Sequence, residues 1–129
     1  MIAVDTNVLV RIVTNDDVEQ AKRALLLLQR EQFLIPKTVF LEMEWVLRHA
    51  YRLERAAIFQ AFLGILGLPN VIIEDPTCVA RAVGWYEDGL DFADALNLAA
   101  SAGAEKFFTF DNRFYRKASA IKGVVVARI

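Results

Sequence analysis

Short apolar runs alternate with longer stretches of helical periodicity along the chain. The apolar runs cover residues 2–4, 33–35, 71–73, 106–110 and 124–126. The first run is too short for a helix and does not alternate with polar residues, which is typical of a strand buried on both faces in a parallel sheet. Strands that alternate with helices indicate a three-layer α/β fold, in which helices flank a central parallel sheet.

Polar residues predict where the helices between these runs begin. We expect helices over 8–13, 18–30, 39–51, 54–66, 76–87, 92–102 and 112–119. Asp16, with Glu19 three residues later, resembles a capping box for the second helix. Thr38 is the expected cap of the third helix, and Asp91 opens the sixth.

The composition indicates one globular domain. The chain has 129 residues, enough for a core, and 56% of them are hydrophobic. Nothing resembles a signal peptide, and the most apolar stretch, 57–73, is too interrupted to span a bilayer. Cys78 is the only cysteine, which fits a reducing cytoplasm and predicts a small buried helix residue. A net charge of −1 excludes a basic nucleic-acid wrapper but not an enzyme that acts on nucleic acid.

Acidic residues stand at the ends of strands and the starts of helices. Asp5 and Asp111 follow apolar runs, Asp91 and Asp94 share the first turn of a helix, and Glu42 lies one turn into another. The ligand crevice of an open α/β sheet lies outside the carboxyl ends of its strands. Clustered carboxylates repel one another and raise their own pKa values, and Mg²⁺ or Mn²⁺, which prefer oxygen ligands, would relieve this repulsion.

Each acid also has a purely structural interpretation. Asp5 and Asp91 can be helix caps, and for Asp91 the two interpretations weigh about equally. Asp94 can be a favourable charge near a helix N-terminus.

Four segments together resemble the PIN-domain ribonucleases, specifically the VapC-type toxins of toxin–antitoxin pairs. They are VDTNVLVR (4–11), EMEWVLR (42–48), DFADAL (91–96) and TFDNRF (109–114), in the order of that family. The resemblance implies a Rossmann-like PIN fold over residues 1–129, acting as a single domain. It also implies metal-binding acids at Asp5, Glu42, Asp94 and Asp111, with Asp91 near the pocket. Finally, it implies a homodimer and a small antitoxin whose tail blocks the active site.

Polar neighbours of these acids are candidates for supporting roles. Thr6 and Thr109 are either turn residues or groups that orient the carboxylates, and Asn7 supports Asp5. Arg11 and Arg113 follow the acidic motifs closely and are candidates for contact with RNA phosphates.

Other polar and aromatic residues are expected to be structural. Glu44 does not share the face of Glu42 and is interpreted as solvated. His49, the only histidine, is expected at the surface rather than as a general base. Trp45 and Trp85 are expected in the core or at an interface, with both candidates for exposure.

The sequence therefore predicts a Mg²⁺- or Mn²⁺-dependent endoribonuclease of the cytoplasm, with RNA as its substrate. One alternative is a phosphoacceptor signalling domain, which needs an aspartate after the third strand and a lysine after the last. Asp75 is better explained as a helix cap, and the last strand is followed by Ala127 and Arg128. The other alternative is a PIN-fold binding module without catalysis, against which the complete set of acids argues.

Overall fold

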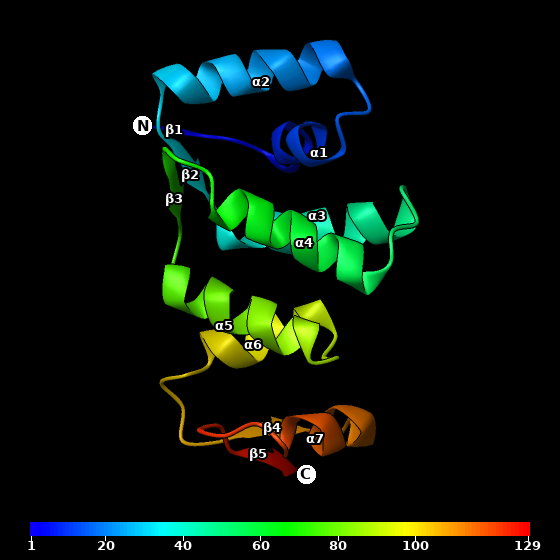
Figure 1. Ribbon diagram of the computed structural model, residues 1–129. Coiled ribbons are helices and arrows are strands. Elements are labelled where there is room, and N and C mark those ends of the chain that lie inside the picture. Colours follow the sequence, from blue (N-terminus) through cyan, green and yellow to red (C-terminus); the bar gives the residue numbers. More distant parts are fainter. The chain divides into compact units, whose positions relative to one another are not determined.

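A computed structural model describes residues 1–129 as two compact units, Met1–Pro76 and Thr77–Ile129, which are described here one at a time (Figure 1). The N-terminal unit contains β1 (Ile2–Ala3), α1 (Thr6–Thr14), α2 (Val18–Arg30), β2 (Phe33–Ile35), α3 (Lys37–His49), α4 (Arg55–Leu66) and β3 (Val71–Ile73). The helix α5 (Pro76–Glu87) leads into the C-terminal unit, which continues with α6 (Phe92–Ala100), β4 (Phe107–Thr109), α7 (Asn112–Ala118) and β5 (Val126–Arg128).

All strand pairs are parallel, which confirms the α/β fold with a parallel sheet flanked by helices. In the N-terminal unit the strand order is β1-β2-β3, with Ile2 opposite Phe33 and Phe33 opposite Val71. In the C-terminal unit β4 pairs with β5, and Phe107 lies opposite Val126. Parallel pairing requires a crossover between strands, and the helices of each unit provide it.

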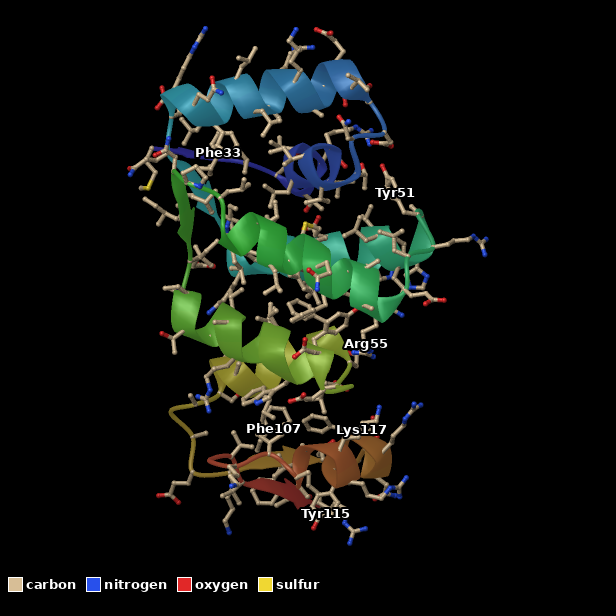
Figure 2. All side chains as sticks on the ribbon, viewed as in Figure 1. Phe33, Tyr51, Arg55, Phe107, Tyr115 and Lys117 are labelled. Atoms are coloured by element: carbon tan, nitrogen blue, oxygen red, sulfur yellow. The ribbon has the colours of Figure 1, made fainter.

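The core of the N-terminal unit lies between its sheet and its helices. Phe33, in the middle strand, is fully buried (Figure 2), as are Phe40 of α3 and Phe62 of α4. The last two rings lie 5.9 Å apart. The helix α1 packs against α2, α3 and α4, so the residues at its start are held by three neighbours.

The C-terminal unit has aromatic contacts of its own. The rings of Phe107 on β4 and Phe114 on α7 meet edge to face at 5.5 Å, an arrangement that aromatic pairs favour. Cys78 is buried in α5, as the sequence predicted. No helix of the chain is long and apolar enough to cross a membrane.

The expected cap of α2 was wrong by one residue. Asp17, not Asp16, caps this helix, because its side chain accepts a hydrogen bond from the backbone N–H of Gln20 at 3.0 Å. The carboxylate of Asp16 is already bound by Arg11 and Tyr51, a contact between distant residues that periodicity cannot reveal.

Two other boundaries also differ from expectation. Thr38 does not cap α3, which begins at Lys37 after Pro36; the N–H of Lys37 donates instead to Glu74 Oε1 at 2.9 Å. The last strand was expected at 124–126 and is observed two residues later, as Val126–Arg128, because its pairing with β4 fixes the register.

Candidate active site

Asp5 lies between β1 and α1 and caps that helix. Its Oδ1 accepts a hydrogen bond from the N–H of Val8 at 3.4 Å, and its side chain is exposed. The cap uses one carboxylate oxygen, so the other oxygen remains for a ligand. The structural interpretation of Asp5 is thus correct, and it is compatible with metal binding.

Thr6 links the start of α1 to α3. This residue is buried, and its hydroxyl donates a hydrogen bond to Oε2 of Glu42 at 3.1 Å. Glu42 itself is exposed, so the bond from Thr6 restricts a side chain that would otherwise rotate freely in water. This hydrogen bond is the one expected if Thr6 orients a carboxylate rather than serving only as a turn residue.

Asp91 and Asp94 share the first turn of α6. Asp91 caps the helix, and its Oδ1 accepts from the N–H of Asp94 at 3.1 Å. Burial, and then the negative charges of Asp91 and Asp111, raise the pKa of the Asp94 carboxyl above its ordinary value, while Lys117 opposes the shift. Burial and the charges of Asp91 and Asp111 therefore disfavour ionisation of the Asp94 carboxyl.

Asp111 follows β4 and caps α7. Its Oδ1 accepts from the N–H of Phe114 at 3.0 Å, and its own N–H donates to Thr109 Oγ1 at 2.9 Å. Thr109 therefore shapes the turn that leads into α7. It positions Asp111 through the backbone rather than through the carboxylate.

The donor chemistry of these acids suits a hard divalent cation. Asp5, Glu42, Asp91, Asp94 and Asp111 offer only oxygen, which Mg²⁺ and Mn²⁺ prefer. Asp5 and Glu42 belong to the N-terminal unit and the other three to the C-terminal unit. The structure contains no group of three or more such side chains that could hold a metal ion.

The two arginines predicted to contact RNA, Arg113 and Arg11, differ in their exposure and hydrogen bonding. Arg113 is exposed on α7, and Asn7, the predicted support of Asp5, is exposed on α1. Arg11 donates to Gln20 at 2.7 Å and to Tyr51 at 2.8 Å, and it pairs with Asp16 at 3.2 Å. Phosphate binding by Arg11 stays a prediction that would require some of these bonds to open.

Glu44 is not solvated, which corrects the sequence-based expectation. Its side chain is only 5% exposed, and it forms two hydrogen bonds with Arg48 one turn later, at 2.9 and 3.1 Å. Burial of a carboxylate is tolerable when a guanidinium pairs with it. The spacing of four residues to an arginine was the signal that could have predicted the pair.

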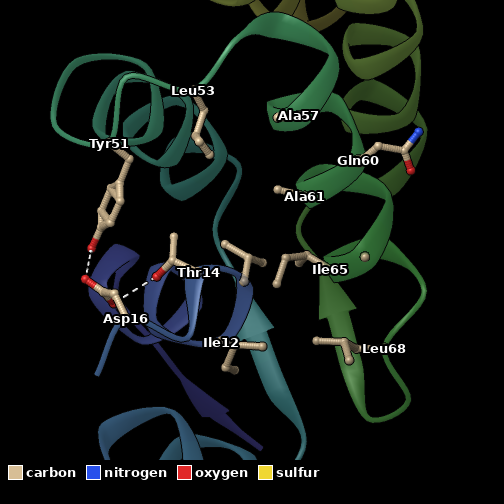
Figure 3. Close-up of a pocket in the computed structure, with 12 residues that line it drawn as sticks. Ile12, Thr14, Asp16, Tyr51, Leu53, Ala57, Gln60, Ala61, Ile65 and Leu68 are labelled. Carbon is tan, nitrogen blue, oxygen red and sulfur yellow. Dashed lines mark hydrogen bonds between the residues drawn. The ribbon is translucent and has the colours of Figure 1, made fainter. Parts of the chain in front are cut away.

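A hollow in the N-terminal unit was not anticipated. Figure 3 shows this cavity of about 720 Å³ between α1 and α4, lined mainly by apolar side chains. Tyr51 and Asp16 lie at one end, where the Tyr51 hydroxyl donates to Asp16 at 2.7 Å and Thr14 donates to it at 2.9 Å. These hydrogen bonds, with the charge of Arg11, lower the pKa of the Asp16 carboxyl.

A second groove, of about 530 Å³, lies between α1 and α2. Arg23 and Arg30 line it together with Leu26 and Leu27. Both leucines are more than 40% exposed, as is their neighbour Leu25. The groove therefore combines an apolar surface with positive charge.

A known protein family matches most of the chain. The model of the PIN domain matches residues 2–120, and therefore extends over both units. Comparison with curated proteins returned no relative.

Proposed function

Because the chain belongs to the PIN-domain family, whose members are typically metal-dependent nucleases, we propose that it is a Mg²⁺- or Mn²⁺-dependent endoribonuclease. The observation that supports this best is the setting of Asp94, where burial, and then the charges of Asp91 and Asp111, raise the pKa of its carboxyl. Carboxylates that oppose one another in the free protein gain stability from a cation. The family match also argues against the alternative of a phosphoacceptor signalling domain, because residues 2–120 match the PIN domain instead.

In this proposal Asp5, Glu42, Asp94 and Asp111 bind the metal, with Asp91 in a supporting position. A bound divalent ion would lower the pKa of a water molecule and stabilise the leaving oxygen of the phosphodiester. The protein contributes fixed carboxylates: helix caps orient Asp5 and Asp111, and the Thr6 hydroxyl orients Glu42. No histidine or cysteine nucleophile is required.

The test is cleavage of RNA by metal-free protein to which metal is returned. We expect hydrolysis with Mg²⁺ or Mn²⁺ and none in EDTA. Asp5→Asn and Asp94→Asn should each abolish it, because each removes one ligand charge with little change in shape. Asp17→Asn is the matched control, since Asp17 also caps a helix but lies outside the proposed site.

Cleavage that persists undiminished in EDTA would refute the metal mechanism. Wild-type levels of cleavage in Asp5→Asn protein would refute the site assignment. Absence of cleavage under every metal condition, in folded protein, would favour the non-catalytic binding module.

We further propose that this nuclease is the toxin of a VapBC-type pair, acting as a homodimer. The exposed leucines of α2 and the neighbouring groove support a protein partner, because isolated soluble proteins rarely leave such residues grouped at the surface. The partner would be a small antitoxin whose tail reaches the acidic site with a basic residue.

A further inference from the structure

The exposed face of α3 carries an aromatic pair next to a proposed metal-binding acid. Glu42, Trp45 and His49 occupy positions i, i+3 and i+7 of the helix, and all three are exposed. Trp45 leaves 58% of its surface in water, although an indole is among the most favourable groups to bury. Its ring lies 4.6 Å from that of His49, so the two rings form one continuous surface.

Glu42 lies one turn before Trp45 on the same face of the helix. Helical side chains generally lean toward the N-terminus, which favours a position of the Trp45 indole on the side of Glu42. Residues three apart on a helix have Cβ atoms about 5–6 Å from each other. Any flat group that stacks on Trp45 is therefore held beside the Glu42 carboxylate.

We propose that Trp45, supported by His49, is a stacking platform for an unpaired base of the RNA substrate. This inference rests on the proposed ribonuclease function and names the form of RNA that the site takes. Proteins that bind single-stranded nucleic acid stack bases on exposed aromatic rings, and sequence-specific contacts are not needed, since every base has a π-face. A base held there would place its flanking phosphodiester near Glu42.

The surroundings of Trp45 favour a nucleotide over a protein partner. His49 and Arg52, on and after α3, are exposed polar or basic residues, the side chain of Arg48 is 46% exposed and pairs with Glu44, and Glu42 is the exposed acidic residue of this face. Positive charge beside an aromatic ring suits a base with its phosphate. The grouped exposed leucines, which suit a protein partner, lie instead on α2.

The platform can be tested by binding, without relying on cleavage. In an Asp94→Asn background with Mg²⁺, a short unstructured oligoribonucleotide is titrated against the protein, and tryptophan emission is followed. The chain has two tryptophans, so Trp85→Phe isolates Trp45, and Trp45→Phe isolates Trp85, which is half-buried under Arg81. We expect quenching of Trp45 and little change in Trp85.

Affinity gives the second readout. Trp45→Ala should weaken oligonucleotide binding roughly 10-fold, as removal of one stacking ring typically does, while Trp45→Phe keeps most of the affinity. In otherwise wild-type protein, Trp45→Ala should raise KM for unpaired RNA more than it lowers kcat. Circular dichroism of each variant shows that the fold is kept, and because Trp45 is exposed, no large change is expected.

Unchanged affinity in folded Trp45→Ala protein, or unquenched Trp45 emission on saturation with RNA, would overturn the platform. So would a loss of self-association in Trp45→Ala protein with RNA binding intact, which would make this face an interface between copies of the chain. Quenching of Trp45 in a protein that cleaves RNA under no metal condition would leave the platform standing and refute the nuclease. Metal-dependent cleavage that is unchanged in Trp45→Ala protein would support the nuclease and overturn the platform.

Discussion

At the scale of single residues, the hydroxyl of Thr6 is the best-defined support of a candidate acid. It is buried, and it holds Glu42 across 36 positions of sequence. Groups that orient metal-binding carboxylates commonly matter for activity almost as much as the ligands do.

Thr6→Val removes this hydrogen bond and nearly preserves side-chain shape. We expect cleavage to fall about 10-fold, because Glu42 loses its orientation. Stability should change by no more than about 1 kcal/mol, since water can replace the donor at the exposed carboxylate. Thr6→Ser, which keeps the hydroxyl, is the control for kinetic assays and thermal melts. Equal activity of the valine and serine variants would show that the bond has no catalytic role.

Asp94 allows a prediction about stability. Burial and the charges of Asp91 and Asp111 raise its folded-state pKa above the ordinary 3.8, so the ionised form costs stability at neutral pH. Metal-free Asp94→Asn protein should therefore be as stable as wild type at pH 7, or slightly more stable. The gain should stay below about 1 kcal/mol, because the partly exposed carboxylate is screened and also favours the helix N-terminus.

The pH dependence of stability tests whether the ionised Asp94 carboxylate destabilises the folded protein. The cost is fully present above the folded-state pKa, declines as the pH falls from that pKa toward 3.8, and disappears below 3.8, because the carboxyl is then protonated in both states. Denaturant unfolding should show the two proteins converging in acid. A clear loss of stability in Asp94→Asn at neutral pH would contradict the proposed repulsion.

Sequence alone predicted some of these residue roles and missed others. The capping positions of Asp5 and Asp91 follow from local preferences, and the structure shows both bonds. The burial of Glu44 was missed, because it depends on how α3 packs and not only on its periodicity. Asp16 was misassigned for the same reason, since its partner Tyr51 lies 35 positions away.

At the scale of elements, a polar network joins the end of α1 to the end of α3. Arg11 donates to the Tyr51 hydroxyl, and that hydroxyl donates to Asp16, which follows α1. Thr14 and Arg11 also donate hydrogen bonds to the same carboxylate. The network closes one end of the cavity between α1 and α4 (Figure 3).

Tyr51→Phe removes the hydroxyl at the centre of this network. We expect a melting temperature a few degrees lower at pH 7, because Asp16 and Arg11 each lose a partner. The pKa of Asp16 is lowered in the folded state, so its contribution is present above its ordinary 3.8 and is lost as the pH falls through the lower folded value. The difference between the two proteins, measured by thermal melts, should therefore shrink in strong acid. A difference that does not depend on pH would mean that Tyr51 acts through packing alone.

Most elements were predictable because their signals are local. The bounds of α2, β2 and β3 agree with the sequence-based ranges, since apolar periodicity and terminating residues coincide there. The start of α3 was not predictable, because Glu74, from a distant loop, binds the first N–H of that helix. The register of β5 was likewise set by its pairing with β4.

At the scale of the whole molecule, the parallel α/β fold was predictable from the alternation of strands and helices. The family match over residues 2–120 agrees with it. The acids of the proposed site were chosen by their place after strands and by resemblance. Strand order, which decides which strand ends are neighbours, cannot be read from one sequence.

The proposed assembly gives a prediction at this scale. Light scattering at micromolar concentration should show a homodimer. In the proposed toxin–antitoxin pair, a small antitoxin should bind the chain and inhibit cleavage. Replacing Leu26 and Leu27 with glutamate should weaken that complex, because charge would enter the apolar groove of α2. A monomer would contradict the dimer, and unaffected binding by the double variant would exclude α2 as the contact.

The helix caps formed by the candidate acids have a genetic consequence. Asn caps a helix about as well as Asp, so the fold tolerates this exchange at Asp5, Asp91 and Asp111. The two residues have codons that differ by a single nucleotide. If the chain is the toxic nuclease proposed above, selection against it should favour point mutations at these codons, which would abolish the activity without removing the protein. Cells with such a mutation would still produce a folded, inactive chain that binds the proposed antitoxin. Loss of activity and loss of the gene would therefore have different effects on a population.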